Sequence, residues 1–318
     1  MVYLDFEQPI ADLLIQLEKL QKVGVDGDIS VSASVKQIKQ KIKSKRKEIY
    51  EGLTPWQKVQ VARHPNRPYT LDYIKGICSE FEEFHGDRNF GDDHAIVGGL
   101  GKIDGQAVMI IGHQKGSNTK ERQFRNFGMA NPEGYRKALR LMRLAEKFDI
   151  PIVTMIDTPG AYPGIEAEER GQAEAIARNL FEMVQLKVPV INYIIGEGAS
   201  GGALGIGVGD LLFMLEYTWF SVISPEGCAS ILWRSADFKE EASKQLKLTS
   251  PDMLELGIID GVVKEPNGGA HADVEKMQQN FKEHILKSLD KLKKMDAQKR
   301  INKRIEKLEA IGQFEITT

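Results

Sequence analysis

The segment Ile156-Asp-Thr-Pro-Gly-Ala-Tyr-Pro-Gly164 decides how the middle of this 318-residue chain folds. It follows a short apolar run, residues 151–156, and contains the glycines and prolines that end a strand and form a turn. A second segment, Gly196-Glu-Gly-Ala-Ser-Gly-Gly-Ala203, comes directly after the apolar run 188–195. Main-chain amides in such turns can approach a ligand closely, because glycine has no side chain in the way. Both segments are therefore candidates for an anion site, although such turns also serve as tight connections.

The pattern around these two segments alternates between strands and helices. Apolar runs at 95–100 and 107–111 flank Asp104-Gly105, a dipeptide typical of a β-hairpin turn. Strand, turn and helix in repetition predict an α/β fold. The other predicted elements are strands at 211–215 and 256–263 and helices at 133–148, 167–186 and 201–208.

Both ends of the chain are predicted to be helical extensions. Apolar residues at helical spacing predict one helix around 13–20 and another at 35–50, joined by a linker at 24–34. Its prolines make residues 54–68 an irregular crossing into the main body, and the charged stretch 271–311 predicts a long C-terminal helix. The expected division is a helical arm and linker (1–94), a core (95–270) and a C-terminal helical extension (271–318).

Composition limits the classes of function. The 43 basic and 45 acidic residues give a formal net charge of −2, so overall charge offers no argument for a nucleic-acid partner. Cys78 and Cys228 are far apart, and the scattered histidines lack ligand spacing, so no metal is predicted. The sequence shows neither a secretory signal pattern nor an apolar run near ~20 residues, and we expect a cytoplasmic protein.

Gly201 and Gly202 are the leading candidates for an anion site. If they open a helix after the strand that ends near Ile195, their main-chain N–H groups have no partner inside that helix and lie at its positive end. A ligand oxygen could then accept hydrogen bonds from both. The alternative is structural: the glycines only let helix and strand pack closely.

The same residues match the Gly-x-Ser-x-Gly signature of serine hydrolases, with Ser200 as the nucleophile. In that family an acid and then a histidine follow along the chain. His271, with Asp252 or Asp260 as the acid, fits this order, whereas His284 falls in the charged C-terminal helix. This alternative predicts a serine that reacts with serine-directed reagents.

Three further features suit the binding of nucleotides or other anions. Asp157-Thr-Pro-Gly160 matches the Asp-x-x-Gly element of GTPases, but no Gly-x-x-x-x-Gly-Lys-Ser/Thr loop is present to hold phosphates. Between residues 113 and 143, eight basic residues stand against two acidic ones, which suits a polyanionic ligand or a solvated helix face. His113, at the end of a predicted strand, is either a ligand-polarising donor or a structural residue.

Several long motifs point to one family when they are taken together. They are Met109 to Gly116, Asn126 to Met129, Pro132 to Met142, Ile156 to Gly164, Ala167 to Gln172, Glu197 to Gly202 and Val222 to Trp233. The chain closely resembles the alpha subunit of the bacterial acetyl-coenzyme A carboxylase carboxyltransferase, and the similarity extends from Leu4 to His271. One departure is Ala199, where the family's usual pattern has glycine, but it leaves Gly201 and Gly202 unchanged.

The resemblance implies a crotonase-like fold, which is a spiral of β-β-α units with oxyanion holes made of paired backbone amides. It also implies a reaction in which a carboxyl group moves from carboxybiotin, held on a carrier protein, to acetyl-CoA and forms malonyl-CoA. The implied partners are a beta subunit that bears a zinc ribbon, in a heterotetramer of two alpha and two beta chains, the biotin carboxyl carrier protein and biotin carboxylase.

By the same resemblance, Gly201 and Gly202 are the catalytic residues, whose N–H groups stabilise negative charge on the biotin ureido oxygen. No side-chain nucleophile is implied. A non-catalytic scaffold related to this family is the remaining alternative, and it predicts that changes at the glycine pair leave the rate of the assembled complex intact. The residues expected to bind the carboxybiotin are Gly160, Tyr162, Gly198 and Ser200.

Overall fold

The computed structural model describes residues 2–23 and 29–312. Within these residues, an eight-stranded sheet has the order β1-β2-β3-β4-β5-β6-β8, and β7 pairs with β5 beside this path. The first pairings are antiparallel, and from β3 onward neighbouring strands are parallel. The strands are β1 (Glu80–Glu83), β2 (Ile96–Ile103), β3 (Gln106–His113), β4 (Ile152–Thr158), β5 (Val190–Ala199), β6 (Leu211–Leu215), β7 (Trp219–Ser221) and β8 (Gly261–Val263).

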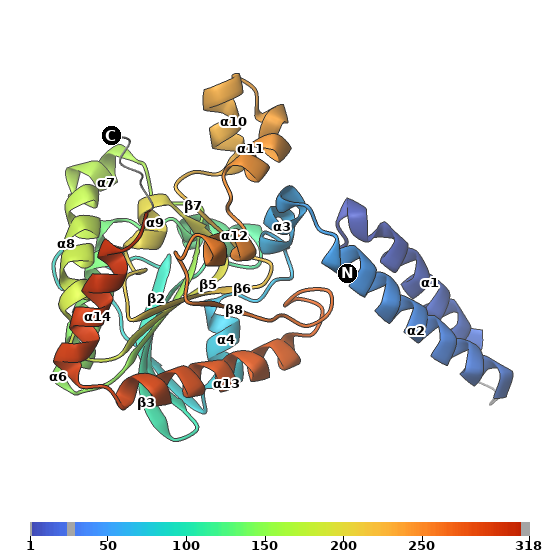
Figure 1. The fold of residues 1–318 in the computed structure, drawn as a ribbon, viewed down its shortest axis with the longest axis horizontal. Helices are drawn as coiled ribbons and strands as arrows, with labels where there is room; N and C mark the ends of the chain where they lie inside the picture. Colours follow the sequence, from blue (N-terminus) through green and yellow to red (C-terminus); the bar gives the residue numbers. More distant parts are fainter. Residues whose placement is uncertain (1, 24–28, 313–318) are drawn as a thin grey trace, which may run out of the picture.

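Helices cover both faces of this sheet (Figure 1). They are α1 (Gln8–Val23), α2 (Ile29–Glu51), α3 (Pro55–Ala62), α4 (Thr70–Ile77), α5 (Thr119–Phe124), α6 (Pro132–Lys147), α7 (Ile165–Glu169), α8 (Gln172–Gln185), α9 (Ser200–Leu204), α10 (Pro225–Trp233), α11 (Lys239–Gln245), α12 (Ser250–Glu255), α13 (Val274–Lys293) and α14 (Ala297–Glu309). Ile194 packs in one core layer with Met142 of α6. Tyr193, which points to the opposite face because side chains alternate along a strand, packs with Phe281 of α13.

The predicted alternation of strands and helices through the core is confirmed. The hairpin between β2 and β3 turns at Asp104 and Gly105, whose φ angles are 45° and 82°. Both values lie in the left-handed region that a two-residue hairpin turn of this type requires. The body is therefore an α/β structure in which β4 and β5 occupy the centre of the sheet.

Several predicted boundaries are wrong, and each has a local cause. The crossing at 54–68 contains α3, because Thr54 and Gln57 cap each other reciprocally and Pro55 takes the first helical position. The helix predicted at 167–186 is two helices, α7 and α8, separated by Gly171 with a φ of 84°. The strand predicted at 256–263 is right only for its last three residues, which form β8.

The N-terminal arm consists of α1 and α2, which pack against each other and extend away from the body (Figure 1). Residues 24–28 of the predicted linker lie outside the described residues, and residues 29–34 belong to α2. A cluster that includes Ile10, Tyr50 and Tyr217 joins the base of the arm to the body. The three-part division of the chain stays a proposal, with the observation that β1, before residue 95, pairs with β2 at the edge of the sheet.

The C-terminal extension is two helices rather than one. Asp296 accepts hydrogen bonds from the N–H groups of Gln298 (2.9 Å) and Lys299 (3.2 Å), and thereby starts α14 after the end of α13. On α14, Arg304 is fully buried and donates to Asp210 (2.8 Å) and to the carbonyl of Met183 (2.7 Å) in the last turn of α8. The extension is thus fixed to the sheet by a buried ion pair.

Replacing Arg304 with alanine should lower the free energy of unfolding by about 3–5 kcal/mol, because Asp210 would keep a buried charge without its partner. Lys303→Ala, at the exposed neighbouring position, should change it by less than about 0.5 kcal/mol. Urea denaturation followed by circular dichroism measures both values. Equal stability of the two variants would contradict this assignment.

Candidate functional site

The two glycine-rich segments lie side by side beyond the carboxyl ends of β4 and β5. A Cβ atom on Gly202 would come within 2.5 Å of the carbonyl carbon of Gly160 and within 2.7 Å of the nitrogen of Ala161. Both of these are backbone atoms, which cannot give way as a flexible side chain can. Glycine at 202 is therefore required by packing, and this contact brings the two turns together as one site.

The main-chain amides of Gly201 and Gly202 have no acceptor within the described residues, although Gly201 is half-buried and Gly202 is buried. Strand β5 ends at Ala199, α9 begins at Ser200, and within the described parts of the chain no acceptor takes either glycine N–H. The helix predicted at 201–208 is shorter than expected, because α9 has only 5 residues. Its dipole is correspondingly small, so the candidate anion site consists of the two unpaired donors themselves.

Ser200 precedes the glycine pair with a φ of 55°, in the left-handed region that serine seldom adopts. Its exposed side chain lies at an apolar cleft of about 280 Å³. The other lining residues are Leu204, Phe220, Ser221, Val222, Leu246, Met253, Leu256 and Ile258. The cleft suits a ligand with an apolar body whose polar edge faces the start of α9.

The remaining predicted binding residues occupy different positions around this point. Gly160 has a φ of 148°, and a Cβ there would meet nothing within 4 Å, so its outer side is open. Tyr162 is half-buried, and its N–H donates to the carbonyl of Ala130 at 3.0 Å. Gly198 is buried, and a Cβ there would lie 3.0 Å from the ring of Phe220. The structure therefore brings Gly160, Ser200 and the glycine pair together, with Gly198 beneath them.

A cluster of buried charges lies under this site and was missed in the sequence analysis. Lys115 Nζ is 2.5 Å from both Asp157 Oδ1 and Glu197 Oε2. Arg63 extends the cluster, because its Nε lies 2.6 Å from Glu197 and its Nη1 lies 2.5 Å from Glu226. The available signal was a charged residue near the carboxyl end of each of three neighbouring strands, since parallel strands bring their carboxyl ends to one edge.

The charges in this cluster shift one another's pKa values. Burial alone would lower the pKa of Lys115. The carboxylates of Asp157 and Glu197 more than offset this effect, so the pKa of Lys115 is raised. For Glu197, burial is opposed by Lys115 and Arg63, which together lower its pKa. Burial dominates for Asp157 and raises its pKa. Lys115 and Glu197 are thus charged at neutral pH.

A second cleft, of about 250 Å³, is lined in part by Pro159 of the first glycine-rich segment. Lys115 and Glu197 form part of its wall, together with Arg63, Tyr69, Arg122, Phe127 and Ala62. The charge cluster therefore separates this polar cleft from the buried strands. The apolar cleft is thus bordered by Ser200 at the start of α9, and the charged cleft by Pro159 of the first glycine-rich segment.

The serine-hydrolase alternative is wrong, because the structure does not bring a histidine to Ser200. His271 is instead 3.9 Å from Glu7 and stacks on His64. The candidate acids are also engaged elsewhere: Asp252 accepts hydrogen bonds from Thr249, and Asp260 accepts the N–H of Leu212 at 2.7 Å. No described residue pairs with the Ser200 hydroxyl as a base.

The features suggestive of nucleotides or polyanions are also used inside the protein. Asp157 is 1% exposed and pairs with Lys115, so it is not free to act as in a GTPase. Most of the basic stripe is engaged as well; for example, Arg136 pairs with Asp87 at 2.8 Å and the buried Lys137 pairs with Asp92 at 2.6 Å. His113 is fully buried, and burial, aided by the charge of Lys115, lowers its pKa to about 3, so its ring is neutral.

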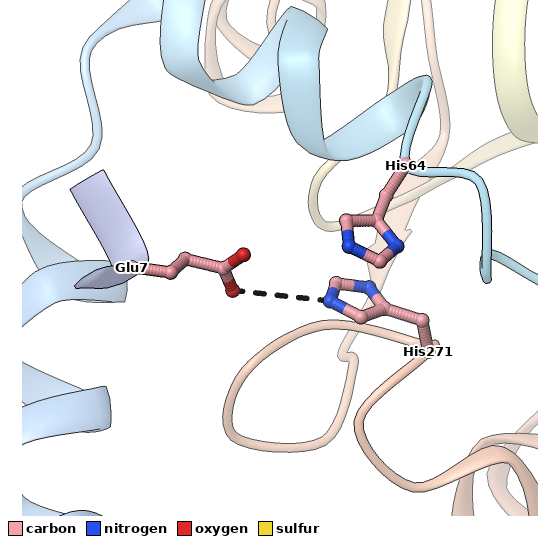
Figure 2. A group of neighbouring side chains, drawn as sticks. All are labelled: Glu7, His64 and His271. Carbon is pink, nitrogen blue, oxygen red and sulfur yellow. Dashed lines mark ion pairs between the residues drawn. The ribbon is translucent and has the colours of Figure 1, made fainter. Parts of the chain in front are cut away.

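Glu7, His64 and His271 form a compact group at the base of the N-terminal arm (Figure 2). The rings of the two histidines stack with centroids 3.8 Å apart and an interplanar angle of 13°. Both ring nitrogens of His64 already have partners, because Nδ1 accepts the N–H of Asn66 at 3.1 Å and Nε2 lies 3.1 Å from the carbonyl oxygen of Val2. Glu7 already accepts from Tyr50 (2.6 Å) and from the N–H of Leu4 (2.9 Å). This group joins the start of the arm to the body through contacts among its own side chains.

Comparison with known proteins identifies close relatives over the full length. A family model described as "Acetyl co-enzyme A carboxylase carboxyltransferase-like" matches residues 3–312. The acetyl-coenzyme A carboxylase carboxyl transferase subunit alpha of Flavobacterium johnsoniae is 60% identical over 315 residues, which cover 99% of both chains. The subunit alpha of Methylococcus capsulatus is 55% identical over 313 residues, which cover 98% of both chains.

Solved structures of a geranyl-CoA carboxylase subunit and of a transcarboxylase share the fold. The beta subunit of P. aeruginosa geranyl-CoA carboxylase matches with a TM-score of 0.55 at 18% identity, over 78% of this chain and 46% of that one. The transcarboxylase 12S core matches with a TM-score of 0.54 at 19% identity, over 70% of this chain and 42% of that one. The predicted crotonase-like α/β fold is confirmed. No helix among the described residues has the length and apolar character needed to cross a membrane.

The His64 imidazole gives a prediction about acid stability. Burial, together with the charge of His271, lowers its pKa to about 4 from an ordinary value of 6.5. Between pH 6.5 and 4, His64 is therefore protonated in the unfolded chain but neutral in the folded chain. Protonation stabilises the unfolded chain, so the free energy of unfolding is undiminished above pH 6.5 and falls as the pH drops toward 4. Between pH 7 and 4.5, the free energy of unfolding should fall less steeply for His64→Gln than for the wild type. Equal slopes for His64→Gln and the wild type would contradict the lowered pKa of His64.

Proposed function

The chain belongs to the family of acetyl-coenzyme A carboxylase carboxyltransferase alpha subunits, and we propose that its glycine pair supplies the anion site for carboxyl transfer. The proposed reaction moves a carboxyl group from carboxybiotin, held on a carrier protein, to acetyl-CoA and yields malonyl-CoA. The observation that carries this proposal is the pair of unpaired N–H groups on Gly201 and Gly202 beside an apolar cleft.

Carboxybiotin supplies the carboxyl group and, after its departure, a ureido nitrogen basic enough to take a proton from the acetyl methyl group. The part of this chain is to stabilise negative charge as it develops on the ureido oxygen. Two fixed main-chain donors do this without rearrangement, and no side-chain nucleophile is needed. Loss of one such donor typically lowers turnover by ~100- to 1000-fold.

The surroundings of the glycine pair fit the shape of biotin, which has an apolar body and a polar ureido edge. We propose that the apolar cleft beside Ser200 receives the ring and that the open side of Gly160 faces it. We also propose that Tyr162 and Gly198 contribute to the carboxybiotin site, Gly198 through its contact with Phe220 in the wall of this cleft. Coenzyme A thioester is the second substrate, and its site is completed by another subunit.

The partner that completes the site is a carboxyltransferase beta subunit, in a complex of two alpha and two beta chains. Cys78 and Cys228 are the only cysteines of the chain, so the zinc ribbon of this enzyme class belongs to the partner. The biotin carboxyl carrier protein delivers the carboxyl group, and biotin carboxylase loads it. We place this assembly in the cytoplasm.

The requirement for a partner is tested by assaying the purified chain with and without the beta subunit. We expect malonyl-CoA formation from carboxybiotin only in the mixture, because this chain supplies half of the reaction centre. Radiolabelled carboxyl transfer measures the rate. Full activity of the isolated chain would contradict the proposal.

The role of the amides is tested by comparing Gly201→Pro with Gly201→Ala in the assembled complex. Proline removes the N–H, so we expect turnover to fall on the order of 100-fold, whereas alanine keeps the N–H. The alanine Cβ would lie 3.4 Å from Ile176, which leaves room for it, and its turnover should stay within about fivefold.

Proline also restricts the residue before it, so the same comparison is repeated in a Ser200→Gly background, where the backbone at 200 is unrestricted. Size-exclusion chromatography checks that each complex assembles. Equal turnover of the proline and alanine variants would refute the proposed anion site and favour the non-catalytic scaffold.

A further inference from the structure

We propose that Asp157 is a positioning residue for carboxyl transfer: its carboxylate fixes the main chain that leads into Gly201 and Gly202. This inference rests on the proposed function, because it concerns the direction of the same two amides. Asp157 belongs to the turn that decides the fold but has no part in the proposed chemistry itself. Three observations, on strand register, on packing and on charge, support its role.

The register between β4 and β5 is interrupted at Asp157. Ile156 lies opposite Ile194, but Thr158 lies opposite Gly198, so β5 advances further than β4 across this point. The regular ladder cannot continue through such an irregularity. The side chain of Asp157 replaces it, because Oδ1 accepts the main-chain N–H of Glu197 at 2.9 Å.

The carboxylate also occupies the space that a side chain on Gly196 would need. A Cβ there would lie 2.5 Å from Cγ of Asp157 and 2.7 Å from its Oδ2. Glycine at 196 and aspartate at 157 therefore fit each other. Any movement of the carboxylate acts directly on the main chain of β5.

The charge cluster holds the carboxylate in this position. Lys115 Nζ is 2.5 Å from Asp157 Oδ1, the same oxygen that accepts the N–H of Glu197. Lys115 also pairs with the side chain of Glu197, which Arg63 holds from the other side. The strand end is thus fixed through its backbone and through its side chain.

A second contact links the same two segments a few residues further on. Gly202 packs on Gly160 and Ala161, with the Cβ position of Gly202 only 2.5 Å from the Gly160 carbonyl carbon. Residues 157–161 therefore contact the chain at two points. Asp157 contacts β5 just before the glycine pair, and Gly160 and Ala161 contact Gly202 in α9. A misplacement of ~1 Å in a reaction centre can lower a rate ~100-fold, so the geometry of Asp157 bears on turnover.

The test compares Asp157→Ala and Asp157→Asn in the complex assembled with the beta subunit. Alanine removes the acceptor, and we expect kcat to fall on the order of 100-fold while the KM for acetyl-CoA changes less than about threefold. Asparagine offers a carbonyl oxygen in the place of Oδ1, where both contacts converge. It should therefore restore kcat to within about fivefold of the wild type.

Asp210 provides a matched control. Its carboxylate is also buried and ion-paired, and it accepts a main-chain N–H from the opposite end of β5, that of Val190 at 2.8 Å. Asp210→Ala should lower the midpoint of thermal unfolding at least as much as Asp157→Ala, yet leave kcat within about threefold of the wild type. A purely structural role of Asp157 would instead make kcat follow stability in both variants, and would overturn the inference.

Asp157→Asn keeps the inference testable even if Asp157→Ala does not assemble. Asparagine is isosteric with aspartate but uncharged. A loss in kcat on the order of 100-fold in this variant would show that the charge of Asp157 matters rather than its hydrogen-bond geometry, and would overturn its proposed role as a positioning residue. Failure here is distinct from failure of the proposed function. If Gly201→Pro lowers turnover and Asp157→Ala does not, the anion site stands and the role of Asp157 falls.

Discussion

A lysine buried between two carboxylates holds the ends of three neighbouring strands together. Lys115 follows β3, Asp157 lies in β4 and Glu197 lies in β5, and their charged atoms meet 2.5 Å apart. Isolated burial of any one of these charges would cost several kcal/mol. The three strands must therefore reach their final register together before any of these side chains has a stable environment. Asp157 and Glu197 of this cluster lie at the start of the two glycine-rich segments, so the cluster fixes the point from which both turns leave the sheet.

The main features of the core were predictable because they depend on local sequence. The hairpin at Asp104-Gly105 follows from a dipeptide that accepts left-handed backbone angles, and the structure has both residues in that region. The glycine-rich turns after β4 and β5 follow from apolar runs that end in glycine and proline. The position of Gly201 and Gly202 beyond the apolar run of β5 was accessible in the same way, and the long family motifs are the basis of the chemistry that we propose for them.

The remaining features depend on contacts between distant residues or on subtle capping signals. The charge cluster joins residues 63, 115, 157, 197 and 226, and no short window of sequence contains more than one of them. Ser200 shows why a motif alone was insufficient: its surroundings match a hydrolase signature, but His271 lies at Glu7 on another part of the molecule. The last helical stretch divides at Asp296, which caps the N-terminus of α14. In the sequence this aspartate is one charged residue among many, so the break between the two helices was not predicted.

Helices α10 and α11 form a small lobe that stands out from the body (Figure 1). Arg63 is one link between the lobe and the strand end, because it contacts Glu226 near the start of α10 and Glu197 near the end of β5. Two exposed apolar residues of α10, Ile231 and Leu232, lie on the same lobe, 70% and 66% exposed. Arg63 thus links a lobe that carries exposed apolar side chains to the strand end beneath the glycine amides, so a protein that binds these side chains would contact an element that is ion-paired to the candidate site.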